Sequence, residues 1–397
     1  MGVSLALLNS GIGLETVVKV KPDAAALARA RDAITGSYAR EVGRGHHTEA
    51  EAVAALERIH ITGDFADLAG CDVVTESVYE DVAPKREVLA AVQDVLGPQA
   101  VFASATSSIP AAMLAEGMRC PSRVVVTHYI WPAHRTRLVE MAVPSFADPD
   151  AVRRIHDLLV RQGKTAITVQ DRPGLLTTRV LTAYWSEVIY LVREGASPER
   201  IDAALEAFGW PMGPCRMMDT VGALALIPSG FRFLHPYLGE RCAGLALVLP
   251  AVAEGYIGHR AGQGFYVHAE GGWKPNEAML ALLRVPGRGV PGGQEIIDRT
   301  MGMIVCEAMH ALAEGVARDW ETVAFAIDNS FAFPRQQGGL LGYVNRLSPE
   351  EWRARLAEFE RLHGPRFRAP GMAESGRAAG IDLSPSLAGH SLARAGT

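Results

Sequence analysis

The sequence of 397 residues is poor in several features that mark specialised classes of protein. Its five cysteines are odd in number and scattered, and none of them form a CxxC or mixed His/Cys pattern with the spacing of metal ligands. No apolar run is long enough to cross a bilayer. The formal net charge of −5 gives no sign of a nucleic-acid partner. We therefore expect no metal site, no disulfide framework, no membrane span and no nucleic-acid partner, and a cytoplasmic location.

The first part of the chain, residues 1–170, alternates between strand-like runs and Ala-rich helical stretches. The strand-like runs are 15–20, 72–75, 101–103, 123–127 and 166–169. Helical periodicity lies between them, for example over 23–39 and 84–96. Continuous apolar strands that alternate with helices are typical of a parallel sheet covered on both faces. We predict a doubly wound α/β domain here.

After residue 170 the pattern becomes nearly all helical, and one motif occurs twice. The spacing R-x7-E-x6-E-G holds for Arg179, Glu187 and Glu194–Gly195, and again for Arg299, Glu307 and Glu314–Gly315. We interpret this repetition as two copies of one helical module, 171–284 and 294–370, joined by a Gly/Pro-rich linker. A chance likeness of two amphipathic helices is the alternative. Residues 371–397 are rich in Ala, Gly, Ser and Arg, and we predict a disordered tail.

A histidine and a carboxylate stand in two strand-like stretches. His128 follows the run RVVVT, and Glu140 lies twelve residues later in LVEM. Ligands collect at the carboxyl ends of strands in parallel sheets, and a histidine oriented by a carboxylate is suited to act as a general base near neutral pH. Ser107 and Ser108, which follow the run VFAS, are candidates to bind the same substrate oxygen. A single strand-end histidine is more often structural, so the residues alone leave both interpretations open.

Four stretches resemble the 3-hydroxyacyl-CoA dehydrogenase family. They are VFASATSSIPAAML (101–114), VVVTHYIWPAHRTRLVEM (124–141), DRPGLLTTRVL (171–181) and ASPERIDAALEAFGWPMGPCRMMDTVG (196–222). The resemblance runs from Met1 to about Pro370 and includes the doubled module of the dehydrogenase half of multifunctional fatty-acid oxidation enzymes. It implies a Rossmann-like doubly wound parallel sheet, followed by an all-α C-terminal domain with a duplicated helical module.

The resemblance also implies roles for individual residues. His128 would accept the proton of the substrate 3-hydroxyl while hydride passes to NAD, with Glu140 as its partner and Ser107 on the substrate oxygen. Glu80 and Lys85 would line the nicotinamide side of the cleft. The implied substrate is an acyl-CoA or acyl-carrier thioester. Because the family's helical module forms dimer contacts, we expect a homodimer, although the duplication leaves open whether a second module replaces the second subunit.

The sequence departs from the family pattern at several positions. The family opens with a strand and a GxGxxG turn that holds the pyrophosphate of the cofactor. Met1–Gly2 aligns with the end of that turn, so we interpret the chain as N-terminally truncated and diverged, with Gly2 as the remaining turn glycine. Lys19 stands where an acidic residue would accept the ribose hydroxyls, which disfavours NAD but suits an NADP 2′-phosphate. Ala105, Trp131 and Thr178 replace three asparagines expected around the substrate.

Three functions are compatible with this sequence. The first is an oxidoreductase that transfers hydride between a 3-hydroxyacyl thioester and NAD or NADP. The second is a cofactor-independent acid–base enzyme, a lyase, isomerase or C–C cleaving enzyme, that uses the same histidine and carboxylate on a thioester and has lost the nucleotide. The third is a non-catalytic subunit of a larger acyl-processing complex.

Overall fold

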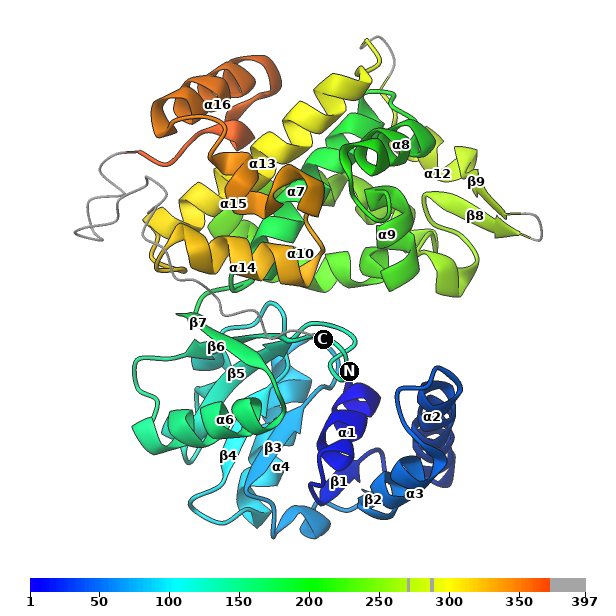
Figure 1. Ribbon diagram of the computed structural model, residues 1–397, viewed down its shortest axis with the longest axis vertical. Helices are drawn as coiled ribbons and strands as arrows, with labels where there is room; N and C mark the ends of the chain where they lie inside the picture. The colour runs from blue at the N-terminus through cyan, green and yellow to red at the C-terminus, as the bar shows by residue number, and fades with distance from the viewer. Residues whose placement is uncertain (270–271, 286–288, 372–397) are drawn as a thin grey trace.

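The computed structural model describes residues 1–269, 272–285 and 289–371, and Figure 1 shows their arrangement in two parts. The α/β part contains the chain as far as β7, and the helical part lies against one end of it. The predicted tail falls outside the described residues apart from Gly371, as do positions 286–288 of the predicted linker. Within the described residues, no helix combines the length and apolar character needed to cross a membrane.

The α/β part contains every strand that the sequence predicts and one more. Its elements are α1 (Gly2–Gly11), β1 (Thr16–Lys19), α2 (Ala24–Gly43), α3 (Glu49–Glu57), β2 (Ile59–Thr62), β3 (Val73–Glu76), α4 (Val82–Val95), β4 (Val101–Ser104), α5 (Ala111–Ala115), β5 (Val124–Tyr129), β6 (Leu138–Val143), α6 (Pro149–Arg161) and β7 (Thr165–Gln170). The additional strand is β2, whose IHIT sequence is short and only partly apolar.

The strands of the α/β part form two sheets. β1 and β2 pair in parallel, and the five others follow the order β3-β4-β5-β6-β7. Neighbouring strands in the larger sheet are parallel, with the exception of β5 and β6, which are antiparallel. The prediction of a wholly parallel sheet is therefore wrong at this one pair. The error is informative, because the antiparallel pair carries the predicted histidine and glutamate.

Alternate residues of the sheet pack against helices on its two faces. Val101 and Ala103 of β4 lie in a cluster with residues of α1 and α6, whereas Phe102 lies in a second cluster with residues of α4 and α5. This period-two division is what a sheet covered on both faces requires. It confirms the predicted doubly wound architecture.

The helical part is built around two long buried helices. Its elements are α7 (Thr177–Arg193), α8 (Pro198–Phe208), α9 (Pro214–Val221), α10 (Ala223–Leu238), α11 (Leu249–Ala253), α12 (Glu277–Leu283), α13 (Gly293–Ala313), α14 (Trp320–Ser330), α15 (Gly339–Val344) and α16 (Pro349–His363). An antiparallel hairpin, β8 (Tyr266–Ala269) and β9 (Gly272–Pro275), interrupts the helices. The nearly all-helical pattern of the sequence gave no sign of this hairpin.

The two copies of the repeated motif bind each other across α7 and α13. Arg179 of the first copy pairs with Glu307 and Glu314 of the second, with Nη1 2.9 Å from Oε2 of Glu314. The reciprocal pairs join Arg299 to Glu187 and Glu194, each at 2.6 Å. Each arginine thus contacts both glutamates of the opposite copy. This exchange is what two copies of one module would make, and the duplication stays a prediction.

Candidate active site

His128 and Glu140 face each other across the antiparallel pair of strands. The register of β5 and β6 sets the two residues directly opposite, a position in which side chains on one face of a sheet make contact. Nδ1 of His128 lies 2.6 Å from Oε2 of Glu140. The glutamate is fully buried, and the histidine side chain keeps 12% of its surface exposed. Among the described residues, no group hydrogen-bonds to Nε2 of His128, so this nitrogen is the one that can meet a ligand.

The N-terminus of α7 holds the carboxylate of Glu140. The backbone N–H groups of Leu176 and Thr177 each donate to Oε1 at 2.9 Å. The Thr177 hydroxyl donates to Oε2. A helix N-terminus stabilises negative charge through its free N–H groups and its dipole. These bonds fix the position of the carboxylate and of the oxygen that orients His128.

Sequence analysis did not identify Thr177. It singled out the neighbouring Thr178, whereas α7 begins at Thr177 and it is this residue that contacts Glu140. Thr178 lies half-buried in the first turn, and no described residue hydrogen-bonds to its hydroxyl. Thr177 contacts Glu140 because the N-terminus of α7 points at this carboxylate. The direction of the helix depends on tertiary contacts, so the local sequence gave no signal of it.

A second polar group forms around Glu80. Its Oε1 accepts hydrogen bonds from the Ser108 hydroxyl at 2.8 Å and from the N–H groups of Ser107 and Ser108 at 3.1 Å. The Thr106 hydroxyl donates to the same oxygen at 2.6 Å. Lys85 Nζ lies 3.2 Å from Oε2 of Glu80. Burial raises the pKa of Glu80, but Lys85 and the hydroxyl donors outweigh it, so the pKa lies below its usual value.

The same contacts distinguish the two serines. Ser108 is buried and its hydroxyl donates a hydrogen bond to Glu80, so its role is structural. The Ser107 hydroxyl is half-exposed and only 3.4 Å from Glu80, a weak contact. None of the described contacts joins either serine to His128. Of the two candidates, Ser107 is therefore the one with a hydroxyl to offer a ligand.

Buried Glu76 is a further residue that sequence analysis missed. Both of its oxygens bind Lys85 Nζ, at 2.9 and 3.1 Å, and the Ser104 hydroxyl donates to it as well. Lys85 is 1% exposed, so its charge is balanced by two carboxylates inside the protein. Lys85 consequently positions Glu80 and its loop. It has little exposed surface with which to contact a ligand.

Trp131 is the most exposed of the predicted site residues, at 69%. It lies in the loop between β5 and β6. Ser4 in α1 bonds to His134 of the same loop at 2.7 Å, so this loop lies against the beginning of α1. A large exposed ring three residues after His128 is an unusual surface feature. It narrows the approach to the site where the family has a small amide.

Gly2 and Lys19 lie where a nucleotide would meet the α/β part. α1 begins at Gly2 and makes no side-chain capping bond, so its first N–H groups are available to phosphate oxygens. Lys19 is the last residue of β1, and its ammonium group lies 3.8 Å from the ring centre of Phe65. Asp23 is a nearby carboxylate, but it accepts a bond from Ala26 N–H at 2.7 Å as the N-cap of α2. The uncapped start of α1 is compatible with a phosphate group, and the role of Lys19 toward a nucleotide stays a prediction.

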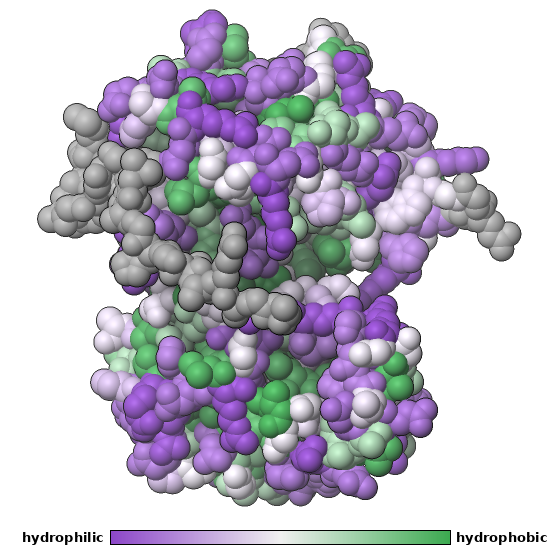
Figure 2. Space-filling model, viewed as in Figure 1, coloured by the Kyte–Doolittle hydropathy of each residue, from purple (hydrophilic) through white to green (hydrophobic). Residues whose placement is uncertain are grey.

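The two polar groups lie where the α/β part meets the helical part. Arg232 of α10 pairs with Asp81 at 2.6 Å, and Phe233 packs against the apolar cluster that contains Ile109. Gly174 N–H donates to the Ser108 carbonyl at 3.2 Å. Figure 2 shows a hollow between the two parts, with apolar residues within it. This geometry is that of a candidate enzyme site between an α/β domain and a helical domain.

Comparison with known families identifies this class. The family model described as 3-hydroxyacyl-CoA dehydrogenase, NAD binding domain, matches residues 1–172. The model described as 3-hydroxyacyl-CoA dehydrogenase, C-terminal domain, matches residues 174–268. Together the two matches span about two thirds of the chain. The chain belongs to the 3-hydroxyacyl-CoA dehydrogenase family, whose members are NAD-dependent enzymes, and it carries the family's NAD(P)-binding domain.

Solved structures of similar proteins agree with this assignment. M. tuberculosis FadB2 is 32% identical, with 68% of this chain and 95% of that protein covered and a TM-score of 0.65. The 3-hydroxybutyryl-CoA dehydrogenase from Escherichia coli K12 is 23% identical, with 95% and 96% covered and a TM-score of 0.77. The dehydrogenase part of multifunctional enzyme 1 from C. elegans is 22% identical, with 92% and 85% covered and a TM-score of 0.59. The last two share the fold over nearly the whole chain.

Proposed function

We propose that the protein interconverts a 3-hydroxyacyl-CoA and the corresponding 3-oxoacyl-CoA, with His128 as the general base and acid. The observation that carries this proposal is the 2.6 Å contact of His128 with a buried glutamate, which leaves Nε2 open to a ligand. Membership in an enzyme family speaks against the non-catalytic subunit. The name of the E. coli neighbour, 3-hydroxybutyryl-CoA dehydrogenase, specifies a CoA thioester.

In the oxidative direction, His128 removes the proton from the substrate 3-hydroxyl. Glu140 keeps the Nδ1 proton in place, so Nε2 has the free electron pair that accepts the new proton. The resulting imidazolium is stabilised by the adjacent carboxylate, which α7 in turn stabilises. Ser107 donates a hydrogen bond to the same substrate oxygen. A bound NAD(P) supplies the hydride acceptor.

The nucleotide would lie along the α/β part. The first turn of α1, at Gly2, would hold the pyrophosphate through backbone N–H groups. Lys19 at the end of β1 would contact the adenosine ribose or its 2′-phosphate. Glu80, fixed by Lys85, would shape the nicotinamide end. Trp131 and Thr178 would border the acyl thioester.

The test is reduction of acetoacetyl-CoA, followed by the loss of absorbance of NADH or NADPH. We expect turnover in the unmodified protein and a loss of about 100-fold or more in kcat for His128→Asn. Nucleotide binding, measured by calorimetry, should survive this substitution. Turnover that is unchanged in His128→Asn would refute the proposed base.

A cofactor-independent acid–base enzyme is the second candidate. It is favoured by Lys19, which leaves the end of β1 without the carboxylate that NAD-binding sites use, and by the exposed Trp131 ring beside the site. Under this alternative, the protein exchanges the C2 protons of acetoacetyl-CoA with deuterated water in the absence of nicotinamide, through His128. Exchange without any nucleotide binding would select this candidate over the dehydrogenase.

A further inference from the structure

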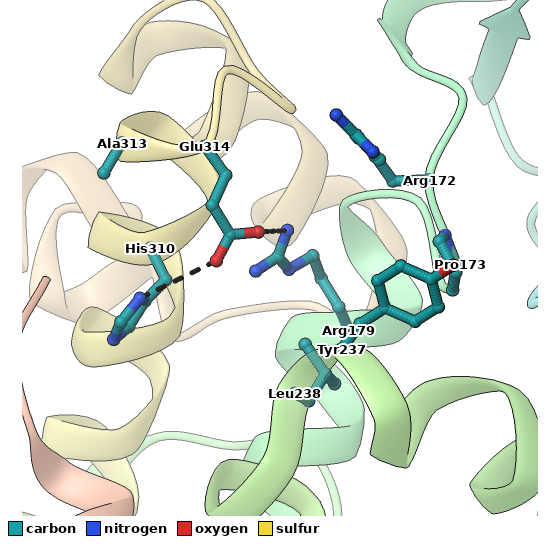
Figure 3. A pocket seen from close by; sticks show the side chains of 8 residues that line it. All are labelled: Arg172, Pro173, Arg179, Tyr237, Leu238, His310, Ala313 and Glu314. Carbon is teal, nitrogen blue, oxygen red and sulfur yellow. Dashed lines mark ion pairs between the residues drawn. The ribbon is translucent and has the colours of Figure 1, made fainter. Parts of the chain in front are cut away.

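A pocket of about 320 Å³ opens on the helical part, beside the segment that joins it to β7. Figure 3 shows its lining, which is Arg172, Pro173, Arg179, Tyr237, Leu238, His310, Ala313 and Glu314. Arg179 and Glu314 belong to the repeated motif, one from each copy. None of the lining residues has a part in the proposed reaction.

The two ends of the repeated motif differ in their number of carboxylates. Around Arg299, three carboxylates gather, because Glu295 adds a contact of 3.2 Å to those of Glu187 and Glu194. The two copies are offset by 120 residues, as Arg179 and Arg299 show, so the position equivalent to Glu295 is Leu175. The Arg179 end therefore has two carboxylates where the other end has three.

The two ends also differ at the second guanidinium nitrogen, because Nη2 of Arg299 contacts Glu187 at 2.6 Å and Glu194 at 3.2 Å. Arg179 is 2% exposed, and its Nη2 has no hydrogen-bond partner in the described part of the chain. A buried donor without a partner costs about 1–3 kcal/mol. Figure 3 shows the Arg179 guanidinium group in the middle of the lining residues, with Glu314 bound to one side of it.

Three arginines lie in or beside the pocket. Arg179 and a second arginine, Arg241, pair with Glu307 and Glu314. Both oxygens of Glu314 are directed at these arginines, at 2.9 and 3.5 Å. Arg172, at the rim, is exposed, and its side chain makes no ion pair or hydrogen bond within the described residues, although the neighbouring Asp171 interacts with it electrostatically. The guanidinium group of Arg172 can therefore contact a ligand at the rim.

His310 adds no charge to this pocket. Burial lowers the pKa of its ring, and the nearby Arg241 lowers it further. Nε2 of His310 lies 2.9 Å from the Arg368 carbonyl, so it carries the ring proton, and Nδ1 is 3.7 Å from Glu314. The neutral ring presents a polar edge to the pocket without adding charge.

We propose that this pocket binds a small anion with a carboxylate or phosphate group, held by Arg172 and the free edge of Arg179. The anion gives Nη2 of Arg179 the carboxylate-like contact that Nη2 of Arg299 has with Glu187 and Glu194 at the other end of the repeat. Planar arginine groups suit both kinds of oxyanion. Because Arg172 and Pro173 belong to the connection between the two parts of the protein, the bound anion also ties this connection to the end of α13.

The test is calorimetric titration with inorganic phosphate, malonate and acetate at constant ionic strength, with thermal unfolding as a second readout. We expect saturable binding of at least one of these anions and a rise in Tm. Phosphate and the two carboxylates are separate arms, so the result also selects the chemical group.

Variants of two exposed residues of the lining make the test specific. Arg172→Ala should weaken binding at least tenfold, and Tyr237→Glu, which brings a carboxylate to the pocket, should abolish it. Arg318→Ala removes an exposed arginine of the helical part outside the pocket and should bind like the unmodified protein. Absence of saturable binding, or equal binding by the Arg172 and Arg318 variants, would overturn the proposal.

Discussion

At the scale of single residues, the hydrogen bonds around Glu140 explain how a buried carboxylate can orient a histidine. Two backbone N–H groups, the Thr177 hydroxyl and His128 occupy its oxygens. Hydrogen bonds to a charged group contribute more than those between neutral groups, about 1.5–3 kcal/mol each. Thr177 is thus a positioning residue that acts through Glu140.

Thr177→Val should reveal this role, with Thr178→Val as the matched control. We expect Thr177→Val to lower kcat about tenfold, because the carboxylate that orients His128 loses a hydrogen-bond donor. Thr178→Val should instead change KM, because Thr178 borders the substrate. Steady-state kinetics over a pH series measures both. Identical profiles for the two variants would contradict the assignment.

Lys19 makes a separate prediction about the cofactor. An acidic residue at the end of the second strand of such domains binds the ribose hydroxyls of NAD, and a basic residue suits the 2′-phosphate of NADP. We expect Lys19→Asp to shift the ratio of NADPH to NADH affinity at least tenfold toward NADH. Calorimetric titration with both nucleotides measures this ratio, and Lys21→Asp, two residues further along the chain, serves as the control. An unchanged ratio of the two affinities in Lys19→Asp would show that Lys19 does not contact the nucleotide.

At the scale of elements, the contact between His128 and Glu140 has a clear origin, while the catalytic role of the pair stays a prediction. His128 and Glu140 were recognised because both lie in apolar runs, and β5 and β6 set them opposite each other. The antiparallel direction of this pair is not encoded locally, because it depends on how the loop 130–137 turns. The start of α7 and the strand β2 likewise depend on tertiary contacts, since neither has a strong local pattern.

A buried carboxylate holds the hairpin of β8 and β9, and it makes the stability of the protein depend on pH. Asp219 accepts the N–H groups of Phe265 and Tyr266 at 3.0 and 2.9 Å. Burial raises its pKa to about 7, and nearby Asp202 adds to the rise. The folded protein therefore holds a proton here that the unfolded chain, with the ordinary pKa of 3.8, releases earlier.

The sign of the effect follows from linkage. Because the folded pKa is raised, the contribution of Asp219 to stability is complete below about pH 4 and is lost as the pH rises through about 7. We expect Asp219→Asn to flatten the fall in Tm between these two values, compared with the unmodified protein. A scan of Tm against pH by calorimetry tests this. If the two curves run parallel, the titrating group lies elsewhere.

At the scale of the whole molecule, the reciprocal ion pairs join two modules within one chain. M. tuberculosis FadB2 matches 68% of this chain with 95% of its own length, so it extends over about one module fewer. Here, the surface of α7 that bears Glu187 and Arg179 is covered by α13 of the same chain. The homodimer expected from the family's single module is therefore one of two possible arrangements. In the other arrangement, the second module takes the place of a second subunit.

We expect the protein to be a monomer of 42.6 kDa in light scattering coupled to size-exclusion chromatography, at all concentrations tested.

The contact between the modules should also be essential for folding. Arg299 is fully buried, and removing one partner from a buried ion pair costs about 3–5 kcal/mol because the remaining charges lose their counterion. Arg299→Ala should therefore lower the free energy of unfolding by about this amount, whereas Arg153→Ala, an exposed arginine of α6, should change it by less than about 1 kcal/mol. A particle of twice the monomer mass, unaffected by Arg299→Ala, would show that association uses another surface.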